Sequence, residues 1–256
     1  NIKLAREQQK KIREVLGKAS EYFQVPPAIP SPTNINSSQF TAALRETINQ
    51  LSREAVGVSV QLPPDFKFSF SQQIRLLTFA RGSLEPLAAQ LGEVKALCDV
   101  LINAKVNSLD GIQRSRVSPD DAAGPQTDYI QLASVTNDLA VLTPYQITFR
   151  SFSHEIAQVP AGFANSPYGF IVRGINVEPA AATVLEQPGT APGGAATYTP
   201  VAPPRPVSMF AATSRPATTP GYTATPGARG GIQTALNEKQ LRITLLVQVV
   251  KLLPKK

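Results

Sequence analysis

Near the end of the chain, residues 239–253 read KQLRITLLVQVVKLL. Every second side chain in this segment is apolar: Leu241, Ile243, Leu245, Val247 and Val249. A period of two is the pattern of a β-strand. The opposite face is mixed rather than charged, so we predict a long strand inside a sheet rather than at its edge.

The clearest helix covers residues 84–105. Its apolar residues recur at intervals of three and four positions: Leu84, Leu87, Leu91, Val94, Cys98 and Leu101. Ser83 is a suitable N-cap, and Pro86 falls in the first turn, where a proline is tolerated. Because Cys98 lies on the buried stripe, we interpret it as a core thiol rather than a nucleophile.

Four shorter strands and one helix complete the predicted body. The strands are expected at 56–62, 108–117, 144–151 and 168–178, and the helix at 152–164, kinked or confined to a turn or two by Pro160. With the elements above, the order is βαββαβ plus a C-terminal strand. This order predicts an α+β fold, a ferredoxin-like sandwich with helices on one face of an antiparallel sheet.

Phe66, Phe68 and Phe70 follow the first predicted strand and also alternate. They either extend that strand beyond a proline break or fill the core from a loop.

The chain is organised into four predicted parts. Residues 1–25 form an amphipathic helix, 26–36 a proline-rich linker, 37–179 together with 239–253 the folded body, and 180–238 a flexible insertion. The body opens with a second helix, capped by Ser37 or Ser38. The first helix presents one apolar seam that needs a partner helix: Ile12, Val15, Leu16, Ala19 and Phe23.

Composition and charge exclude several classes of function. The chain has 256 residues, one Cys and one His, so a two-His metal site, a cysteine cluster and an internal disulfide are excluded. The net charge of +7 sits at the two ends and in the insertion, while residues 24–179 are near neutral, which argues against nucleic-acid binding. The basic ends are either solvated or attracted to anionic lipid.

No catalytic motif stands out. The sequence holds neither a phosphate-binding loop nor a nucleophile elbow. We therefore predict no catalytic residue, cofactor, metal or small-molecule substrate. His154 beside Glu155 is interpreted as a surface or capping residue, and Asp110 and Asp120–Asp121 as ordinary loop carboxylates rather than a cation site.

Arg114 and Arg116 are candidate interaction residues. They lie two positions apart on a predicted strand, so they share one face. They can meet the carboxylates of a partner protein, or they can belong to a solvated sheet face.

The whole pattern resembles a known family. A charged helix, a proline-rich break, a second helix with SQFTAALRETI at 38–48 and an α+β body are similar to the periplasmic part of PilO-type proteins. These are type IV pilus alignment subunits, related in fold to the GspM-type subunits of type II secretion. The chain is also similar to pili-associated envelope proteins of verrucomicrobial gut bacteria, in the helix Leu87–Leu101, the strand Pro144–Phe149 and the insertion before Arg242–Leu252.

The resemblance implies a location and partners. It implies an N-terminal transmembrane helix that precedes this chain, on the periplasmic side of the cell envelope. It also implies a homodimer formed through helices and sheet edges, association with a sister pilus-assembly subunit, and no catalytic residues. The resulting hypothesis is a non-enzymatic envelope scaffold. The alternative is a secreted or surface-exposed module whose insertion or sheet face binds a host or glycan ligand.

Overall fold

The computed structural model describes residues 6–7, 23–31, 35–180 and 239–253. The chain divides into two compact units, 1–181 with 238–256, and 182–237. The second unit lies outside the described residues. So do most of the predicted N-terminal helix and, apart from Ala180, the predicted insertion at 180–238.

One antiparallel sheet forms the framework of the first unit. Its strands are β1 (Ser108–Arg114), β3 (Ala140–Ser151), β5 (Leu241–Leu252) and β4 (Phe170–Pro179), in this spatial order. The short β2 (Val135–Thr136) pairs with the start of β3. β5 pairs with β3 on one side and β4 on the other, which confirms that this segment is an interior strand.

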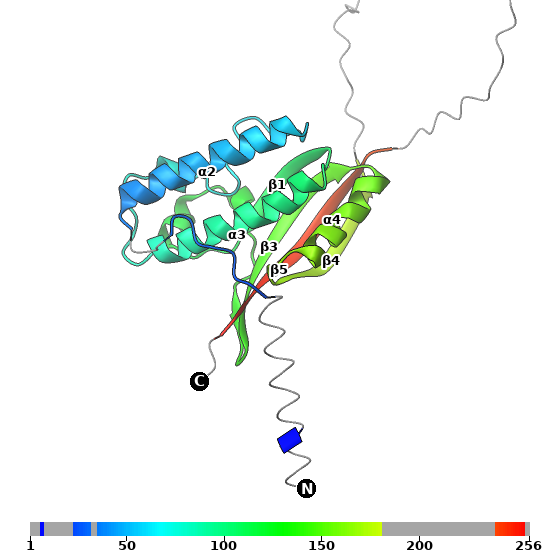
Figure 1. Ribbon diagram of the computed structural model, residues 1–256. Helices are drawn as coiled ribbons and strands as arrows, with labels where there is room; N and C mark the ends of the chain where they lie inside the picture. Colours follow the sequence, from blue (N-terminus) through cyan, green and yellow to red (C-terminus); the bar gives the residue numbers. More distant parts are fainter. Residues whose placement is uncertain (1–5, 8–22, 32–34, 181–238, 254–256) are drawn as a thin grey trace, which may run out of the picture. The chain divides into compact units, whose positions relative to one another are not determined.

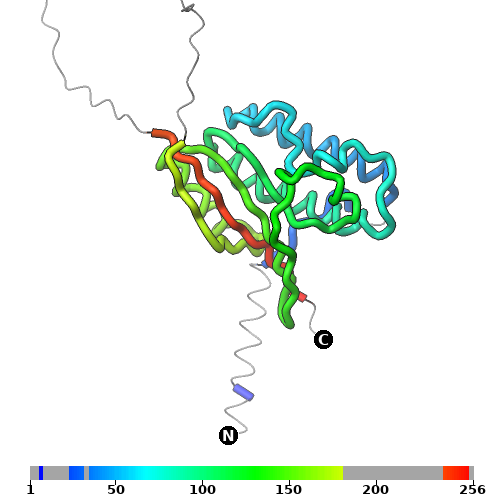
Figure 2. The backbone as a smooth tube through the Cα atoms, turned by 180° about the vertical axis from the view of Figure 1, so that it is seen from behind, coloured from blue at the N-terminus to red at the C-terminus, as the bar shows by residue number. Residues whose placement is uncertain are grey.

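Among the described residues, three helices lie on one side of this sheet: two pack against it and the third packs beside them. They are α2 (Ser37–Gly57), α3 (Leu84–Asn103) and α4 (Ser153–Asn165). Figure 1 shows α3 and α4 against the sheet, with α2 beside α3. Seen from behind in Figure 2, the opposite sheet face carries no helix of the described part of the chain. The predicted α+β class is confirmed.

The two long helices begin in different ways. Asn36 caps α2 in a capping box, in which its side chain accepts from the Gln39 N–H at 2.9 Å and Gln39 reaches back at 3.0 Å. The predicted caps, Ser37 or Ser38, are instead the first two residues of the helix. Ser83 occupies the N-cap position of α3, but its hydroxyl accepts from Ser118 at 2.8 Å and makes no capping bond.

The predicted strand at 56–62 is wrong. Val56 and Gly57 belong to the last turn of α2, and Val58 caps that helix. Only Gln61 touches a strand, through an isolated bridge to Ser108. The alternating residues Val56, Val58, Val60 and Leu62 therefore have no neighbouring strand among the described residues to pair with, apart from the one bridge between Gln61 and β1. The ferredoxin-like βαββαβ order is therefore not confirmed.

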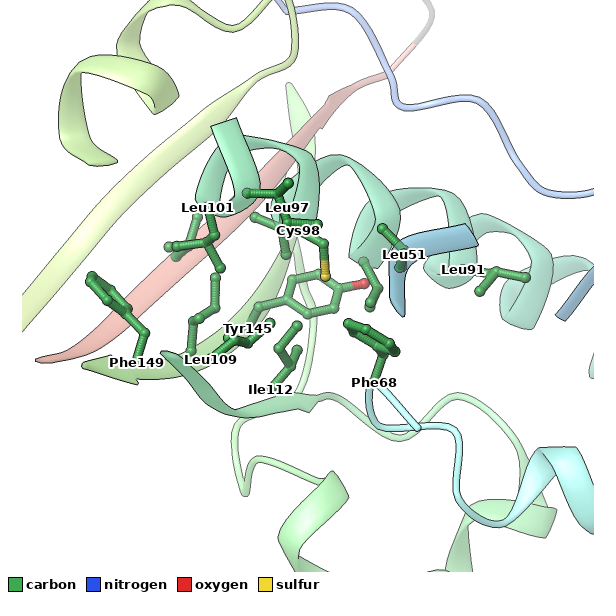
Figure 3. Packing of buried hydrophobic residues seen from close by; sticks show 14 of the residues in the cluster. Leu51, Phe68, Leu91, Leu97, Cys98, Leu101, Leu109, Ile112, Tyr145 and Phe149 are labelled. Atoms are coloured by element: carbon green, nitrogen blue, oxygen red, sulfur yellow. The ribbon is translucent and has the colours of Figure 1, made fainter. Parts of the chain in front are cut away.

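The hydrophobic core lies between α3 and the sheet. Leu97, Cys98 and Leu101 of α3 face Tyr145 and the neighbouring strands (Figure 3). Phe68 and Phe70 are fully buried and come from the loop between α2 and α3, so of the two readings of the phenylalanine repeat, the loop that fills the core is correct.

Candidate functional site

Arg114, one of the predicted interaction residues, is a buried side chain at the end of β1. Its side chain is 0% exposed, and its guanidinium lies between the rings of Phe70 and Tyr129, at 4.7 and 5.0 Å. Its Nη2 donates to Asp121 at 2.7 Å, and its Nη1 donates to Gln90 at 2.7 Å. Every face of this cation is thus occupied by groups of its own chain.

Asp121 completes this buried centre. Its carboxylate accepts from the backbone N–H groups of Val117 and Ser118, at 2.8 and 3.0 Å, and from the Gln73 amide at 2.6 Å. Burial alone would raise the pKa of this carboxyl. The hydrogen bonds and charge of Arg114, with the two backbone N–H groups, outweigh burial and lower the pKa of Asp121 below its ordinary value.

Arg114 therefore does not meet a partner's carboxylate, because Asp121 already supplies one within the chain. β1 ends at Arg114, so Arg116 lies beyond the strand and not beside Arg114 on a sheet face. Arg116 is exposed, donates to Gln126 at 2.9 Å and lies 4.9 Å from the Tyr129 ring. Of the two arginines, only Arg116 is accessible to a partner.

A second buried carboxylate ties α3 to the sheet. Glu93 is 1% exposed, accepts from the Tyr145 hydroxyl at 2.6 Å and forms an ion pair with Lys251 of β5. Burial first, and then the Glu93 charge, raise the pKa of Tyr145 well above its ordinary value. This contact fixes the C-terminal end of β5 to the middle of α3. Glu93 and Tyr145 are enclosed, while the Lys251 side chain is 26% exposed, so the contact ties the buried carboxylate to the surface of the domain.

The other candidate residues do not assemble into a reactive site. Cys98 is fully buried, as predicted, and burial raises the pKa of its thiol well above the usual value. His154 is exposed in the first turn of α4. Asp110 pairs with Arg150 at 3.0 Å, and Asp120 accepts from the Ala80 N–H at 2.9 Å. Within the described ranges, no group of three or more His, Cys, Asp or Glu side chains is arranged to hold a metal.

The segment 23–31 is docked on the body of the domain. Gln24 donates its N–H to the Pro167 carbonyl at 3.0 Å and accepts from the Gly169 N–H at 3.4 Å. Ile29 donates its N–H to Ala88 of α3 at 2.9 Å. A Cβ added to Gly92 would lie 1.9 Å from the Pro27 carbonyl oxygen, so the linker passes α3 at a notch that only glycine leaves open.

Only part of the predicted seam can be located. Ile12, Val15, Leu16 and Ala19 lie outside the described residues. Phe23 is described, lies outside any helix and packs against its own domain, since a Cβ added to Gly169 would lie 2.6 Å from its ring. Phe23 thus makes a contact within the chain.

A groove of about 410 Å³ separates α3 from α4. Its lining includes the small or amide side chains of Ala104, Asn103, Gln158 and Asn165. Tyr168 and Asp99 also line it. Burial raises the pKa of Asp99, although its bond to Lys95 acts in the opposite direction. Asp99, Ser166 and the amide side chains give the groove a polar lining that can hold a polar ligand.

The outer edge of β4 is an accessible feature that the sequence reasoning missed. Ile175 and Val177 are 53% and 46% exposed, although they pair with the buried Leu245 and Ile243. Two signals point to this edge: Gly174 marks a bulge in the strand, and Pro179 is a residue that central strands exclude.

No helix in the described part of the chain is long and apolar enough to cross a membrane.

Comparison with known proteins found one matching family model and several solved structures of similar fold. A family model described as pilus-like matches residues 6–255. The core domain of a protein from Akkermansia muciniphila has a TM-score of 0.54 at 10% identity, over 93% of this chain and 99% of that chain. A structure from the same organism, solved without its transmembrane region, has a TM-score of 0.55 at 9% identity, over 94% and 98%.

A further solved structure with some likeness to the chain is PilO, the type 4 fimbrial biogenesis protein of Pseudomonas aeruginosa. Its TM-score is 0.32 at 12% identity, over 80% of this chain and 98% of that chain. No curated protein sequence matches. The two Akkermansia structures show a shared fold, and the family model spans nearly the whole chain. The predicted resemblance to pilus-associated proteins is confirmed, and the chain belongs to the pilus-like family.

Proposed function

We propose that this protein is a non-enzymatic scaffold of a pilus or type II secretion machine, exposed on the periplasmic side of the cell envelope. The observation that carries this proposal is the pilus-like family match over residues 6–255. The shared fold with the Akkermansia proteins supports it, since one of those structures was solved without a transmembrane region. By analogy, an N-terminal transmembrane helix would anchor this chain.

The scaffold would act by association with itself and with a sister subunit. The apolar positions Ile12, Val15, Leu16 and Ala19 would form a helical seam between two chains. The exposed Arg116 would meet a carboxylate on the sister subunit. Buried ties such as Arg114–Asp121 would keep the body rigid while these surfaces bind.

Crosslinking in the native envelope tests this function. The full-length protein is crosslinked in cells, purified under denaturing conditions and identified together with its partners by mass spectrometry. We expect pilus or secretion subunits of the inner membrane. Recovery of the protein alone, from a soluble or outer-surface fraction, would overturn the proposal. The variant Leu16→Asp should weaken self-association, while Lys10→Asp, on the opposite face of the same predicted helix, should not.

A second function is a module that binds a host or glycan ligand. The α3–α4 groove supports it, because amide side chains and one tyrosine ring are groups suited to hydroxyl-rich ligands. Binding of cell-wall or mucin glycans that Tyr168→Ala abolishes would favour this function. Equal binding by that variant, or no binding by the parent protein, would contradict it.

A further inference from the structure

We propose that the outer edge of β4 pairs antiparallel with β4 of a second copy of this chain, with Asn176 facing Asn176 across a two-fold axis. This inference rests on the proposed function in two respects: the partner is a second copy of a self-associating scaffold, and the N-terminal association holds the two copies together. It is drawn from the geometry of the sheet edges.

The two edges of the sheet differ. Gln61 and Tyr129 bridge the outer side of β1 at Ser108 and Arg114, so both ends of that edge are occupied. On β4, Gln24 occupies only the residues before the strand, at Tyr168 and Gly169. From Ile171 to Pro179, no described residue hydrogen-bonds to the outer side of the strand. A row of unpaired N–H and C=O groups is a template for another strand.

The regular part of this edge is short and nearly symmetric. It runs from Gly174 to Glu178, because a bulge precedes it between Val172 and Gly174 and Pro179 ends it. An antiparallel pair that uses all five residues must be centred on Asn176. The centre is therefore set by the two features that disrupt pairing on either side.

This register is self-complementary in apolar side chains. Residues directly opposite each other in an antiparallel pair share one face of the sheet. Ile175 then lies opposite Val177 of the second copy, and the reverse contact repeats on the other side of the axis. Both side chains lie on the helix-covered face, since they pair with Leu245 and Ile243, and both are about half exposed in the single chain. The pairing covers apolar surface that the chain's own helices leave open.

The same register matches charge. Glu178 lies opposite Gly174 of the second copy, beside the exposed Arg173 of that copy. The Glu178 carboxylate already accepts from Asn176 at 2.7 Å, which holds it at the edge. No like charges face each other in this arrangement. Five paired residues cover less area than a stable dimer needs, so we expect this contact to act together with the N-terminal association in the full chain.

Engineered cysteines test the register directly. Asn176→Cys places two thiols opposite each other, and the single native Cys98 is fully buried and does not compete. Under mild oxidation of the full chain we expect a disulfide dimer. Ile171→Cys, 38% exposed on the same strand, is the matched control and should remain monomeric because it has no equivalent opposite it.

A mixed pair sharpens the test. Gly174→Cys is sterically allowed, since an added Cβ would meet only Leu246, at 3.9 Å. Gly174→Cys mixed with Glu178→Cys should form dimers, whereas each variant alone should not. Adding Ile175→Lys and Val177→Lys to Asn176→Cys should lower its dimer yield by about fivefold or more, because like charges then face each other.

Three results would overturn the inference: no Asn176→Cys dimer, equal dimer yields from Asn176→Cys and Ile171→Cys, or no dimer from the mixed pair. Failure of this inference and of the proposed function are distinguishable. Pilus subunits recovered from the envelope without the Asn176→Cys dimer would leave the scaffold intact and remove this edge contact. An Asn176→Cys dimer without recovery of pilus subunits would support the edge contact and overturn the proposed scaffold function.

Discussion

The guanidinium of Arg114 and the carboxylate of Asp121 lie 2.7 Å apart with both side chains 0% exposed. The pair joins the end of β1 to the loop that follows it, and the Phe70 and Tyr129 rings enclose the cation. A charge enclosed in this way depends on its partner, because the interior offers no water to replace it.

The first prediction concerns this pair. Asp121→Asn leaves the Arg114 charge buried without a counter-charge, so the free energy of unfolding should fall by about 3–5 kcal/mol. Urea denaturation measures it. Asp110→Asn is the control: it breaks the partly exposed pair with Arg150 and should change stability by about 1 kcal/mol or less. Equal losses in the two variants would contradict the buried role of Asp121.

The second prediction is a pH dependence. The fold lowers the pKa of Asp121, so the unfolded chain takes up a proton at this group first as pH falls. Its stabilisation is complete above its ordinary pKa of about 3.9 and is lost as pH falls below that value. The stability gap between the parent protein and Asp121→Asn should therefore narrow from pH 6 to pH 3 in urea titrations. A stability difference between the two proteins that stays constant from pH 6 to pH 3 would contradict a lowered pKa of Asp121 in the folded state.

The third prediction concerns the notch at Gly92. Gly92→Val would drive a side chain into the Pro27 carbonyl, so the linker must leave α3. We expect faster hydrogen exchange at the Ile29 amide and a loss of about 1–3 kcal/mol in stability. Gly57→Ala is the control, because an added Cβ there has no atom within 4 Å, and it should leave Ile29 exchange unchanged. Unchanged exchange in Gly92→Val would show that the linker does not depend on this notch.

The fourth prediction concerns Cys98. A fully buried thiol with a raised pKa should not react with an aromatic disulfide reagent in the native state, and it should react at once in urea. Its reaction rate would then report unfolding of the core. Leu77→Cys, at a position that is 82% exposed, adds a thiol as an internal standard that reacts rapidly. Rapid reaction of both thiols in native protein would contradict the enclosed position of Cys98.

Much of the fold could be predicted from local pattern alone. The stripe from Leu84 to Leu101 and the alternation from Leu241 to Val249 are long and regular, and the structure confirms both elements. Pro160 was expected to kink α4 or confine it to a turn or two, yet the helix spans Ser153–Asn165. The buried Val159 and Phe163 hold it against the domain despite the missing N–H.

The remaining features depend on partners distant in sequence. The valines at 56–60 alternate like a strand, but a strand also needs a free edge beside it, and β1 meets this segment only at Gln61. In the sequence, Arg114 has the features of a surface residue, and only the folded chain brings Asp121, Phe70 and Tyr129 around it. Likewise, no periodicity shows that Ile175 and Val177 lie at an outer edge, since that depends on the spatial order of the strands.

The docked linker also has a mechanical consequence. A pull on the chain ahead of Phe23 reaches the body first through the two backbone bonds of Gln24, beside the start of β4 and the end of β5. Those bonds would give way before the paired strands bear load, and Ile29 on α3 would be next. The segment 23–31 would therefore detach and extend under force before the rest of the domain unfolds. Single-molecule stretching should show this as a small first extension that precedes unfolding of the sheet.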